Sequence, residues 1–401
     1  MKSLVWFSIF LVSYFFYGFV INQYDLYVVP RQLKLENPIG YYDYKGIINV
    51  HTNLSSGTGS HQFILQTARA LNFDFILFTD INQFDGQLND FDYNGTLSLF
   101  GAKYRYLDSR LIYYSQNNLQ LGNNLGDVQV SMADLLTKDT LENKNQILYL
   151  AHPFNAGFTW NGEIPSGMDG MEVLNLKSVA NRAWSRSKLS TLWSLAIYPF
   201  NSRLALMRLF HEPEDELNMY DNITSKRHFV AYAGSEASAR AIPLQNYIVN
   251  FPSYQRTFEM LSNHVLLKSE LTGNLQNDRN KIFNALKNGN FYLALDFIGD
   301  PKGFNTLLED KGRNHLMGSS LKFNNQMKIK TSLAYEPKYS FEIVIYKNGQ
   351  RVFTSHSIQS EFVPTEPGAY RVQVRVSPHW PLPDGRRWVS WIYANPFFLT
   401  P

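Results

Sequence analysis

The chain has 401 residues, enough for two or three domains with a complete hydrophobic core. Hydrophobic residues make up 44% of it and aromatic residues 15%, which excludes a disordered protein. The net charge of +3 comes without a long basic run, so nothing in the sequence indicates nucleic-acid binding. The absence of cysteine excludes disulfides, thiolate metal sites and a cysteine nucleophile, and it leaves the redox compartment open.

The N-terminal segment is typical of a membrane span. Residues 4–21 ("LVWFSIFLVSYFFYGFVI") carry no charge, and as a helix they extend about 27 Å, close to the hydrocarbon thickness of a bilayer. We predict an uncleaved transmembrane anchor over residues 1–22, with a cleaved signal peptide or a buried core helix as alternatives. Lys2 precedes the span and the next basic residue is Arg31, which favours an exported body. A tether is expected over residues 23–45.

The region 46–304 alternates between strand-like and helical patterns. The runs "YKGIINV", "FDFILFTD", "QILYLAHP", "MDGMEVLNL" and "HFVAYAGSEA" are rich in apolar residues, which is typical of strands buried on both faces. Ser60 is predicted to cap a helix in which Ile64, Ala68 and Leu71 share one face. Buried strands separated by helical stretches indicate an α/β fold, either a parallel barrel or an open sheet.

The last region, residues 305–401, has a different pattern. The runs "MKIKTSLAY", "SFEIVIYKNGQRVFT", "AYRVQVRVS" and "RWVSWIYA" are short and rich in β-branched and aromatic residues. The pair Asn348-Gly349 predicts a two-residue hairpin turn. These features predict a small antiparallel β-domain, most simply a sandwich.

Polar residues stand at the ends of the strands predicted in the first region. They are His51, Asp80, His152, Glu172 and Glu236. In α/β folds the carboxyl ends of parallel strands meet on one rim, where the functional sites lie. We therefore expect these five side chains to gather at one end of the fold.

These strand ends carry a family resemblance. The segments "NVHTNLSSGTGS", "FTDIN", "LAHPF", "DGMEVLN" and "GSEAS" resemble, in order, the motifs of the PHP (polymerase and histidinol phosphatase) superfamily. The closest likeness is to its membrane-linked branch related to the CehA/McbA hydrolases, whose motifs read HVHT…SDG, TDHN, G-x-E, GH, HP and G-x-DAH. The resemblance covers nearly everything after residue 45, and it implies a distorted (β/α)7 TIM-like barrel followed by the β-domain. The stretch "SRLALMRLF" is expected to pack on the barrel as a helix, with a membrane-surface helix as the alternative.

The chain departs from the motifs at most of the positions where the family binds metal. Active members hold two or three divalent ions, which generate hydroxide and neutralise phosphoryl charge. His51, Asp80 and His152 are kept and remain the candidate catalytic residues. The altered positions are Asn49 and Ile81 for histidines, Ser56 for an aspartate, Lys103 for a glutamate, Arg110 for a histidine, and Glu236 and Ser238 for the Asp and His of the last motif.

Two expectations follow for ligands. The remaining donors His51, His152 and Glu236 are too few for a multi-metal cluster, so no metal cofactor is expected, and one divalent ion held by these three is the alternative. Lys103 and Arg110 are expected either to neutralise Asp80 and Glu236 or to form a pocket for an anion such as phosphate. His51, His152 and Asp80 also fit a purely structural, hydrogen-bonded role.

Three functions remain open at this point. The first is a membrane-anchored PHP-like protein that is catalytically inactive and acts as a binding or scaffolding module. The second is a metal-dependent hydrolase of the phosphoesterase type with a reduced or rearranged site. The third is a structural envelope protein with a vestigial pocket. The sequence implies a membrane partner through its N-terminal helix, and it names neither a ligand nor a protein partner.

Overall fold

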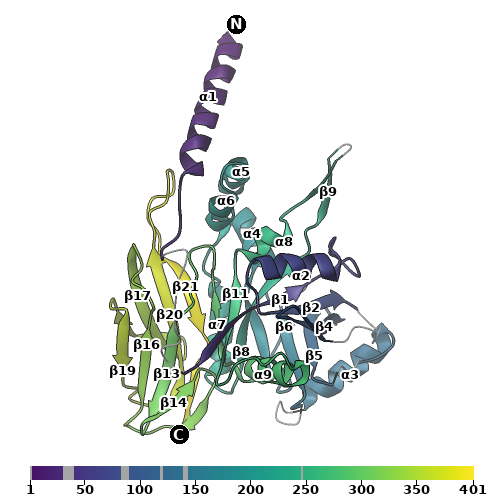
Figure 1. The fold of residues 1–401 in the computed structure, drawn as a ribbon, viewed down its shortest axis with the longest axis vertical. Coiled ribbons are helices and arrows are strands. Elements are labelled where there is room, and N and C mark those ends of the chain that lie inside the picture. Colours follow the sequence, from purple (N-terminus) through teal and green to yellow (C-terminus); the bar gives the residue numbers. More distant parts are fainter. Residues whose placement is uncertain (1, 30–39, 83–89, 118–120, 139–142, 245–246) are drawn as a thin grey trace.

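A computed structural model describes residues 2–29, 40–82, 90–117, 121–138, 143–244 and 247–401 (Figure 1). Within these residues seven strands close into a barrel in which β8 pairs with β1. The strands are β1 (Tyr42–Val50), β2 (Phe75–Ile81), β4 (Thr96–Tyr106), β5 (Ser109–Ser115), β6 (Gln146–Ala151), β7 (Gly170–Asn175) and β8 (Val230–Ala237). All five strands predicted for this region are confirmed, and β4 and β5 complete the ring.

The barrel is mixed, so the expectation of a parallel barrel was wrong in part. Strand β5 runs antiparallel to both β4 and β6, whereas the other neighbouring strands are parallel. The cause is local, because Tyr106 pairs with Ser109 across a two-residue turn and such a turn can join only antiparallel strands. The shorter strand β3 (Phe91–Tyr93) pairs outside the ring with β4.

Helices cover only part of the barrel, fewer than a TIM-like ring requires. In the described chain, α2 (His61–Ala70) joins β1 to β2, α3 (Leu125–Thr137) joins β5 to β6, and a run of four helices joins β7 to β8. These four are α4 (Leu176–Arg186), α5 (Lys188–Ile197), α6 (Ser202–Leu209) and α7 (Glu214–Thr224). Ser60 caps α2 as predicted, its hydroxyl accepting the Phe63 N–H. The stretch "SRLALMRLF" packs on the body, as predicted, because Leu204 and Met207 of α6 are buried.

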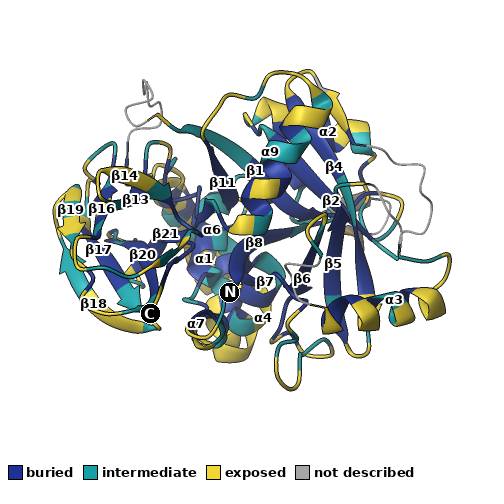
Figure 2. Cartoon of the chain, turned by 90° about the horizontal axis from the view of Figure 1, so that it is seen from below, coloured by how far each residue is buried: buried dark blue, intermediate teal, exposed yellow. Residues whose placement is uncertain are grey.

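Both faces of the barrel strands are buried (Figure 2). Ile48 and Leu77 pack in one hydrophobic cluster, and the alternate residues Ile47 and Ile76 pack in another with Ile64 of α2. This alternation explains why the strand sequences are rich in apolar residues on both faces.

The C-terminal region is a two-layer β-structure, as predicted. One layer contains β20 (Gly368–Ser377), β21 (Val389–Ala394), β17 (Ser340–Lys347), β18 (Gln350–Ser355), β22 (Phe397–Thr400) and β15 (Ser320–Lys322). The other contains β14 (Arg313–Leu316), β13 (Asn305–Asp310), β16 (Lys328–Ser332) and β19 (Gln359–Phe362). Asn348 and Gly349, both with positive φ, form the turn between β17 and β18.

The two regions share one continuous sheet. The first half of β1 pairs with β11 (Ser262–Leu267), β11 pairs with β12 (Phe291–Ala294), and β12 pairs with β21 of the C-terminal region. Helices α8 (Tyr254–Phe258) and α9 (Leu275–Asn288) and the hairpin of β9 (Ala241–Leu244) and β10 (Tyr247–Asn250) complete the chain. The expected boundary near residue 305 therefore marks a change in sequence pattern, but the two regions on either side of it are joined by strand hydrogen bonds.

Helix α1 (Lys2–Asn22) projects from the body (Figure 1). Only 11% of its most apolar window is buried, so the alternative of a core helix was wrong. Among the described helices it alone has the length and apolarity of a membrane span. The following segment is not a free tether throughout, because Leu26, Val28 and Val29 are buried and the Val28 N–H donates to the Ile298 carbonyl.

Candidate functional site at the barrel mouth

The predicted strand-end residues gather at one end of the barrel, on an unusual backbone. Asn49, His152 and Glu236 all have positive φ, of 66°, 38° and 49°. The pairing of β1 with β2 and β8 also shifts register around Asn49, as in a β-bulge. Left-handed non-glycine residues cost about 1–3 kcal/mol each and cluster at functional sites, and bulges re-aim side chains. The backbone here is built to point these three side chains into the mouth.

Asn49, which replaces a family histidine, joins two carboxylates. Its Nδ2 donates to Glu172 Oε1 and to Glu236 Oε1, both at 2.9 Å. Its Oδ1 accepts from Thr79 Oγ1 at 3.0 Å and lies 3.2 Å from His51 Nε2. The amide therefore uses both its hydrogens on carboxylate oxygens, which an imidazole at this position could not do.

Lys103 provides the cation of the site. Its side chain, from β4, is buried with only 1% of the residue exposed, and its ammonium group pairs directly with Glu236 Oε1. His152 Nε2 lies 3.3 Å from the same oxygen. Burial works to raise the pKa of Glu236, but Lys103 first, and then His152, hold the pKa well below its usual range. Glu236 is therefore a carboxylate whose main counter-ion is an ammonium group of the same chain.

His152 and Glu172 form a second pair beneath the first. Glu172 Oε2 accepts from the His152 backbone N–H at 2.8 Å and lies 3.0 Å from His152 Nδ1. Glycine is required at 234, because a Cβ there would lie 1.5 Å from Glu172 Oε1. The Glu172 carboxylate is thus fully enclosed and orients the imidazole.

His51 is a neutral imidazole in this site. Its Nδ1 lies 2.5 Å from Ser56 Oγ, and its Nε2 faces Asn49. Burial first, and then the positive charge of Lys103, lower the pKa of His51 to about 3. Both ring nitrogens are engaged within the protein, as the structural interpretation of this residue predicts.

Asp80 organises the neighbouring loop instead of meeting a cation of the mouth. It accepts from the Thr52 N–H at 2.7 Å, from Thr52 Oγ1 at 2.8 Å and from Ser55 Oγ at 2.5 Å. Of the expected pairings of Lys103 and Arg110 with Asp80 and Glu236, the structure contains that of Lys103 with Glu236. Among the described residues neither cation forms an ion pair with Asp80. Ile81 is half-buried beside this loop and has no ligand atom. The Ser238 carbonyl accepts from the Tyr254 hydroxyl at 3.2 Å.

Arg110 and two cations that the sequence analysis missed surround the mouth. The Arg110 guanidinium lies 4.6 Å from the Phe158 ring centre, and the Lys177 ammonium lies 5.4 Å from it. Arg240 approaches Lys177 from the end of β8, and neither residue has an ion-pair partner among the described residues. Burial lowers the pKa of Lys177; Glu236 opposes this effect, and Arg240 adds to it. The sequence feature that could have predicted Lys177 and Arg240 is a basic residue shortly after each of two motif strands, in "EVLNLK" and "EASAR".

The residues present do not fit a divalent metal ion. A metal needs free carboxylate or imidazole lone pairs, whereas Glu172 and Glu236 accept N–H groups from Asn49 and His152 and an ammonium from Lys103. Among the described residues, no group of three or more His, Asp or Glu side chains is arranged to hold a metal. The single-ion alternative through His51, His152 and Glu236 meets the same obstacle, because the buried ammonium occupies that space. The expected lack of a metal cofactor stays a prediction.

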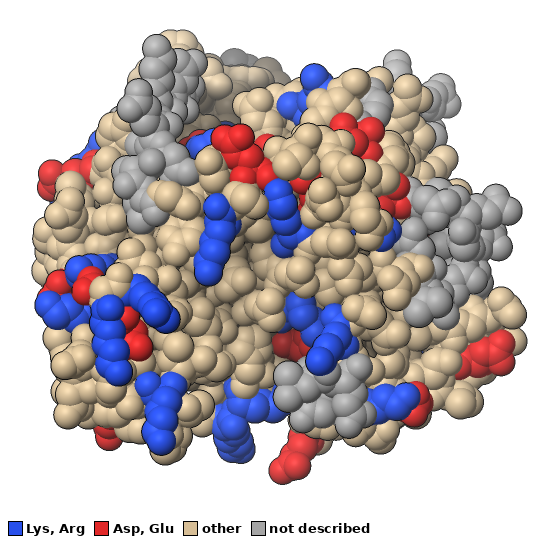
Figure 3. All heavy atoms as spheres, turned by 60° about the horizontal axis from the view of Figure 1, so that its bottom comes forward, with Lys and Arg blue, Asp and Glu red and all other residues tan. Residues whose placement is uncertain are grey.

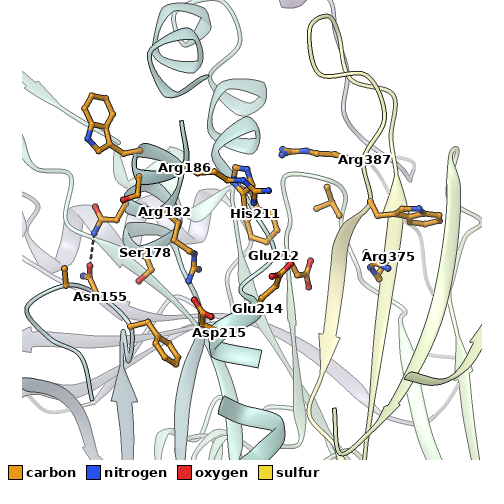
Figure 4. Close-up of a pocket in the computed structure, with 18 residues that line it drawn as sticks. Asn155, Ser178, Arg182, Arg186, His211, Glu212, Glu214, Asp215, Arg375 and Arg387 are labelled. Carbon is orange, nitrogen blue, oxygen red and sulfur yellow. Dashed lines mark hydrogen bonds between the residues drawn. The ribbon is translucent and has the colours of Figure 1, made fainter. Parts of the chain in front are cut away.

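Two cavities flank helix α4. One, of about 360 Å³, adjoins the mouth, and its lining includes Lys177, Glu236 and Arg240 as well as apolar residues of α5 and α6. The second, of about 980 Å³, lies between α4 and the β-domain, where Arg182, Arg186, His211 and Arg387 come close together (Figure 4).

The larger cavity is a polar seam between the two regions. Glu212 accepts hydrogen bonds from Ser390 Oγ and Tyr393 Oη of the β-domain, both at 2.9 Å, and the Arg387 Nη2 donates to the Met207 carbonyl at 3.0 Å. Arg375 pairs with Glu342 at 2.7 Å. These contacts give Glu212, Arg375 and Arg387 a structural role. On the face shown in Figure 3 described basic side chains and acidic side chains both occur.

Comparison with known proteins gives likenesses to solved structures and no sequence match, and two of these structures are described here. No family model and no curated protein matches the chain. A two-domain protein of Bacteroides vulgatus, described as containing a predicted PHP-like metal-dependent phosphoesterase, is similar over 90% of this chain and 99% of its own, with 13% identity and a TM-score of 0.37. A protein of Bifidobacterium adolescentis, described by prediction as a metal-dependent phosphoesterase, is similar over 51% of this chain and 92% of its own, with 11% identity and a TM-score of 0.26. The fold and the site described above rest on this chain's own strand pairing and contacts.

Proposed function

We propose that the protein is a membrane-anchored, exported binding protein whose barrel mouth holds an anionic group and does not work through a divalent metal. The observation that carries this proposal is the buried contact between Lys103 and Glu236. An ammonium group of the chain neutralises the carboxylate that a metal would otherwise need, so Glu236 has its counter-ion without a metal. On this proposal the resemblance to PHP motifs reflects the origin of the barrel, and the protein does not carry out metal-dependent hydrolysis.

The cations around the mouth support an anionic ligand. Lys103 is matched by Glu236, but Arg110, Lys177 and Arg240 have no ion-pair partner among the described residues. Arg110 keeps a buried Nη1 without a hydrogen-bond acceptor. Arg110 and Lys177 are half-buried, whereas Arg240 is exposed at the edge of the mouth. A half-buried cation without a partner is unfavourable, and a bound anion relieves the repulsion between the cations and supplies the missing hydrogen-bond acceptors.

The position of Lys177 adds to this argument. Lys177 lies in the first turn of α4, directly after β7, and this turn contains no acidic residue. The amino end of a helix carries a partial positive charge, so a cation there is unfavourable and an anion is favoured. A phosphate or carboxylate bound beside Lys177 meets the helix end, the ammonium and the Arg240 guanidinium together.

A phosphoesterase is the second candidate. Its support is the resemblance of the motifs and the convergence of His152, Glu172 and Glu236 at the barrel mouth. In that function Lys103 would have to give up its contact with Glu236 before any ion could bind. The two candidates therefore differ in what the purified protein responds to, which is an anion for the first and a metal for the second.

The test compares anions with metals on the full chain in a neutral detergent. We expect phosphate or sulfate to raise the midpoint of thermal unfolding against a chloride control of equal ionic strength, by about 1.4 kcal/mol of stabilisation at tenfold the Kd. Lys177→Gln and Arg240→Gln should each weaken this response. Lys188→Gln is the matched control, since Lys188 is an exposed cation at the start of α5.

Activity measurements decide between the candidates. Phosphomonoester and phosphodiester substrates should not be turned over with added Mn²⁺, Zn²⁺ or Mg²⁺. Metal-dependent turnover that His152→Ala abolishes would establish the phosphoesterase instead. An unchanged unfolding midpoint with every anion would leave the binding proposal without support.

A further inference from the structure

We propose that the anion taken at the barrel mouth is the headgroup of an anionic lipid whose acyl chain lies in the apolar cavity between α4, α5 and α6. This inference rests on the anion site proposed above and names its ligand class. It draws on three independent observations: the mixed charged and apolar lining of the cavity, the contact of its walls with α1, and the exposed apolar side chains around that contact.

The cavity lining combines charged residues of the barrel mouth with apolar residues of the helices. The charged residues Lys177, Glu236 and Arg240, here called the polar side, lie at or just after the ends of β7 and β8. The apolar residues, here called the apolar side, are Leu195 of α5, Leu206 and Leu209 of α6, Phe251 and Met260, and Thr191 and Thr257 also line the cavity. A volume of about 360 Å³ lies within the usual range for small-molecule sites, roughly 300–1,000 Å³. A free phosphate uses only the polar side, whereas an amphiphile fills both.

The helices that form the apolar wall also hold the transmembrane helix. Tyr14 of α1 donates to the Ala196 carbonyl at 2.6 Å, and its ring packs on Phe200 at 5.1 Å. Gly18 permits this approach, because a Cβ there would lie 2.5 Å from the Phe200 ring. Asn201, the cap of α6, donates to the Ile21 carbonyl at the end of α1. The α5–α6 corner and the last turns of α1 are therefore one packed unit (Figure 1).

This packing sets the depth of the corner in a bilayer. Residues 14–21 belong to the predicted span, and at about 1.5 Å per residue they cover roughly 10 Å. Side chains that contact them lie at the same depth, which matches the roughly 5–10 Å at which interfacial helices are buried. The cavity wall is therefore placed beside lipid and not in bulk water.

The surface around this contact is apolar. Leu189 and Leu192 of α5 are 81% and 51% exposed. Leu382, on the β-domain loop that meets α1, is 79% exposed, and its carbonyl accepts from the Tyr17 hydroxyl. Exposed leucines gathered at the base of a transmembrane helix are unfavourable in water and suited to the bilayer boundary. A lipid chain can reach the cavity from this boundary without crossing water.

The charge at the polar side selects the headgroup. Lys177 and Arg240 outnumber Glu236, which is already paired with Lys103. A phosphate monoester headgroup accepts from both free cations, whereas the choline of a zwitterionic headgroup brings a positive charge toward them.

The test uses the full chain in dodecyl maltoside with three probes: dioctanoyl phosphatidic acid, dioctanoyl phosphatidylcholine and inorganic phosphate. Binding is read by native mass spectrometry and by the midpoint of thermal unfolding. We expect phosphatidic acid to bind at least tenfold more tightly than inorganic phosphate, and phosphatidylcholine to bind more weakly than phosphatidic acid by a similar factor.

Two variants separate the halves of the site. Leu206→Trp narrows the apolar side and should weaken phosphatidic acid binding at least tenfold while leaving phosphate binding unchanged. The matched control is Leu125→Trp, the same change at an exposed position of α3 that does not line the cavity. Lys177→Gln with Arg240→Gln should weaken binding of both anions.

Three other outcomes would each contradict a different part of the proposal. Phosphate that binds as tightly as phosphatidic acid, with no effect of Leu206→Trp, overturns the lipid inference and leaves the anion site in place. Equal binding of phosphatidylcholine and phosphatidic acid overturns the headgroup selection. Failure of both anions to bind overturns the proposed function itself.

Discussion

Replacing Lys103 with methionine tests the charge balance on which the site depends. The substitution keeps most of the apolar stem and removes the ammonium, so the Glu236 carboxylate loses its main counter-ion. Only 2% of the Lys103 side chain and 11% of the Glu236 side chain are exposed, so water replaces little of the lost interaction. Removing one partner of a buried ion pair costs about 3–5 kcal/mol.

This cost corresponds to a measurable shift in thermal unfolding. With an unfolding entropy of about 2.1 cal/mol/K per residue over 401 residues, it lowers the midpoint by roughly 4–6 °C. The assay is thermal unfolding of parent, Lys103→Met, Glu236→Gln and the double variant. Because the double variant leaves no unpaired charge, it should recover most of the loss, with a coupling of at least about 2 kcal/mol.

The control is a more exposed pair of the same type. Lys330 and Glu309 form an ion pair on the β-domain whose side chains are 48% and 28% exposed. Lys330→Met should therefore change stability by no more than about 1 kcal/mol. Additive effects of Lys103→Met and Glu236→Gln, within about 0.5 kcal/mol, would refute the argument that the ammonium compensates the carboxylate.

Three further predictions concern metal, pH and the membrane. Lys103→Glu should be less stable than the parent and regain stability with Mn²⁺ or Zn²⁺, because a carboxylate replaces the internal cation; equal stabilisation of the parent by metal would contradict this. His264 on β11 lies 2.7 Å from Asp43. Burial works to lower the pKa of His264, but Asp43 raises it above its usual value. The stability that this pair contributes is therefore complete below about pH 6.5 and is lost as the pH rises through the pKa of His264 in the folded protein. The difference in unfolding midpoint between the parent and His264→Gln should shrink over that range. A difference that stays the same from about pH 5.5 to 9 would contradict this prediction. The full chain should stay in the membrane fraction through alkaline carbonate washing; a mature N-terminus near residue 22 would instead identify a cleaved signal.

The sequence predicted the elements that depend on local pattern. The five buried strands of the barrel, the Ser60 cap and the Asn348-Gly349 turn all follow from short-range chemistry, and the structure contains them. The antiparallel strand β5 escaped prediction, because its turn has Leu107 at φ 50°, a conformation that leucine seldom adopts. No turn signal of the usual Asn-Gly kind marks that position.

The site was predictable in outline only. Strand ends placed His51, His152, Glu172 and Glu236 together, because parallel strands bring their carboxyl ends to one rim. Which carboxylate Lys103 would meet depended on side-chain geometry that no sequence pattern encodes. The free cations that follow β7 and β8 lie outside the motifs, so their convergence required the fold.

The shared sheet has a consequence for the order of folding. Strand β12 belongs by sequence to the barrel region, yet one of its edges is covered by β21, near the C-terminus. Until the final strands have left the ribosome or the export channel, that edge has unpaired backbone N–H and C=O groups, which can pair with a strand of another chain. A chain truncated after residue 304 should therefore aggregate instead of yielding an isolated barrel. Pairing of β21 with β12 is therefore the step that covers this edge and completes the sheet.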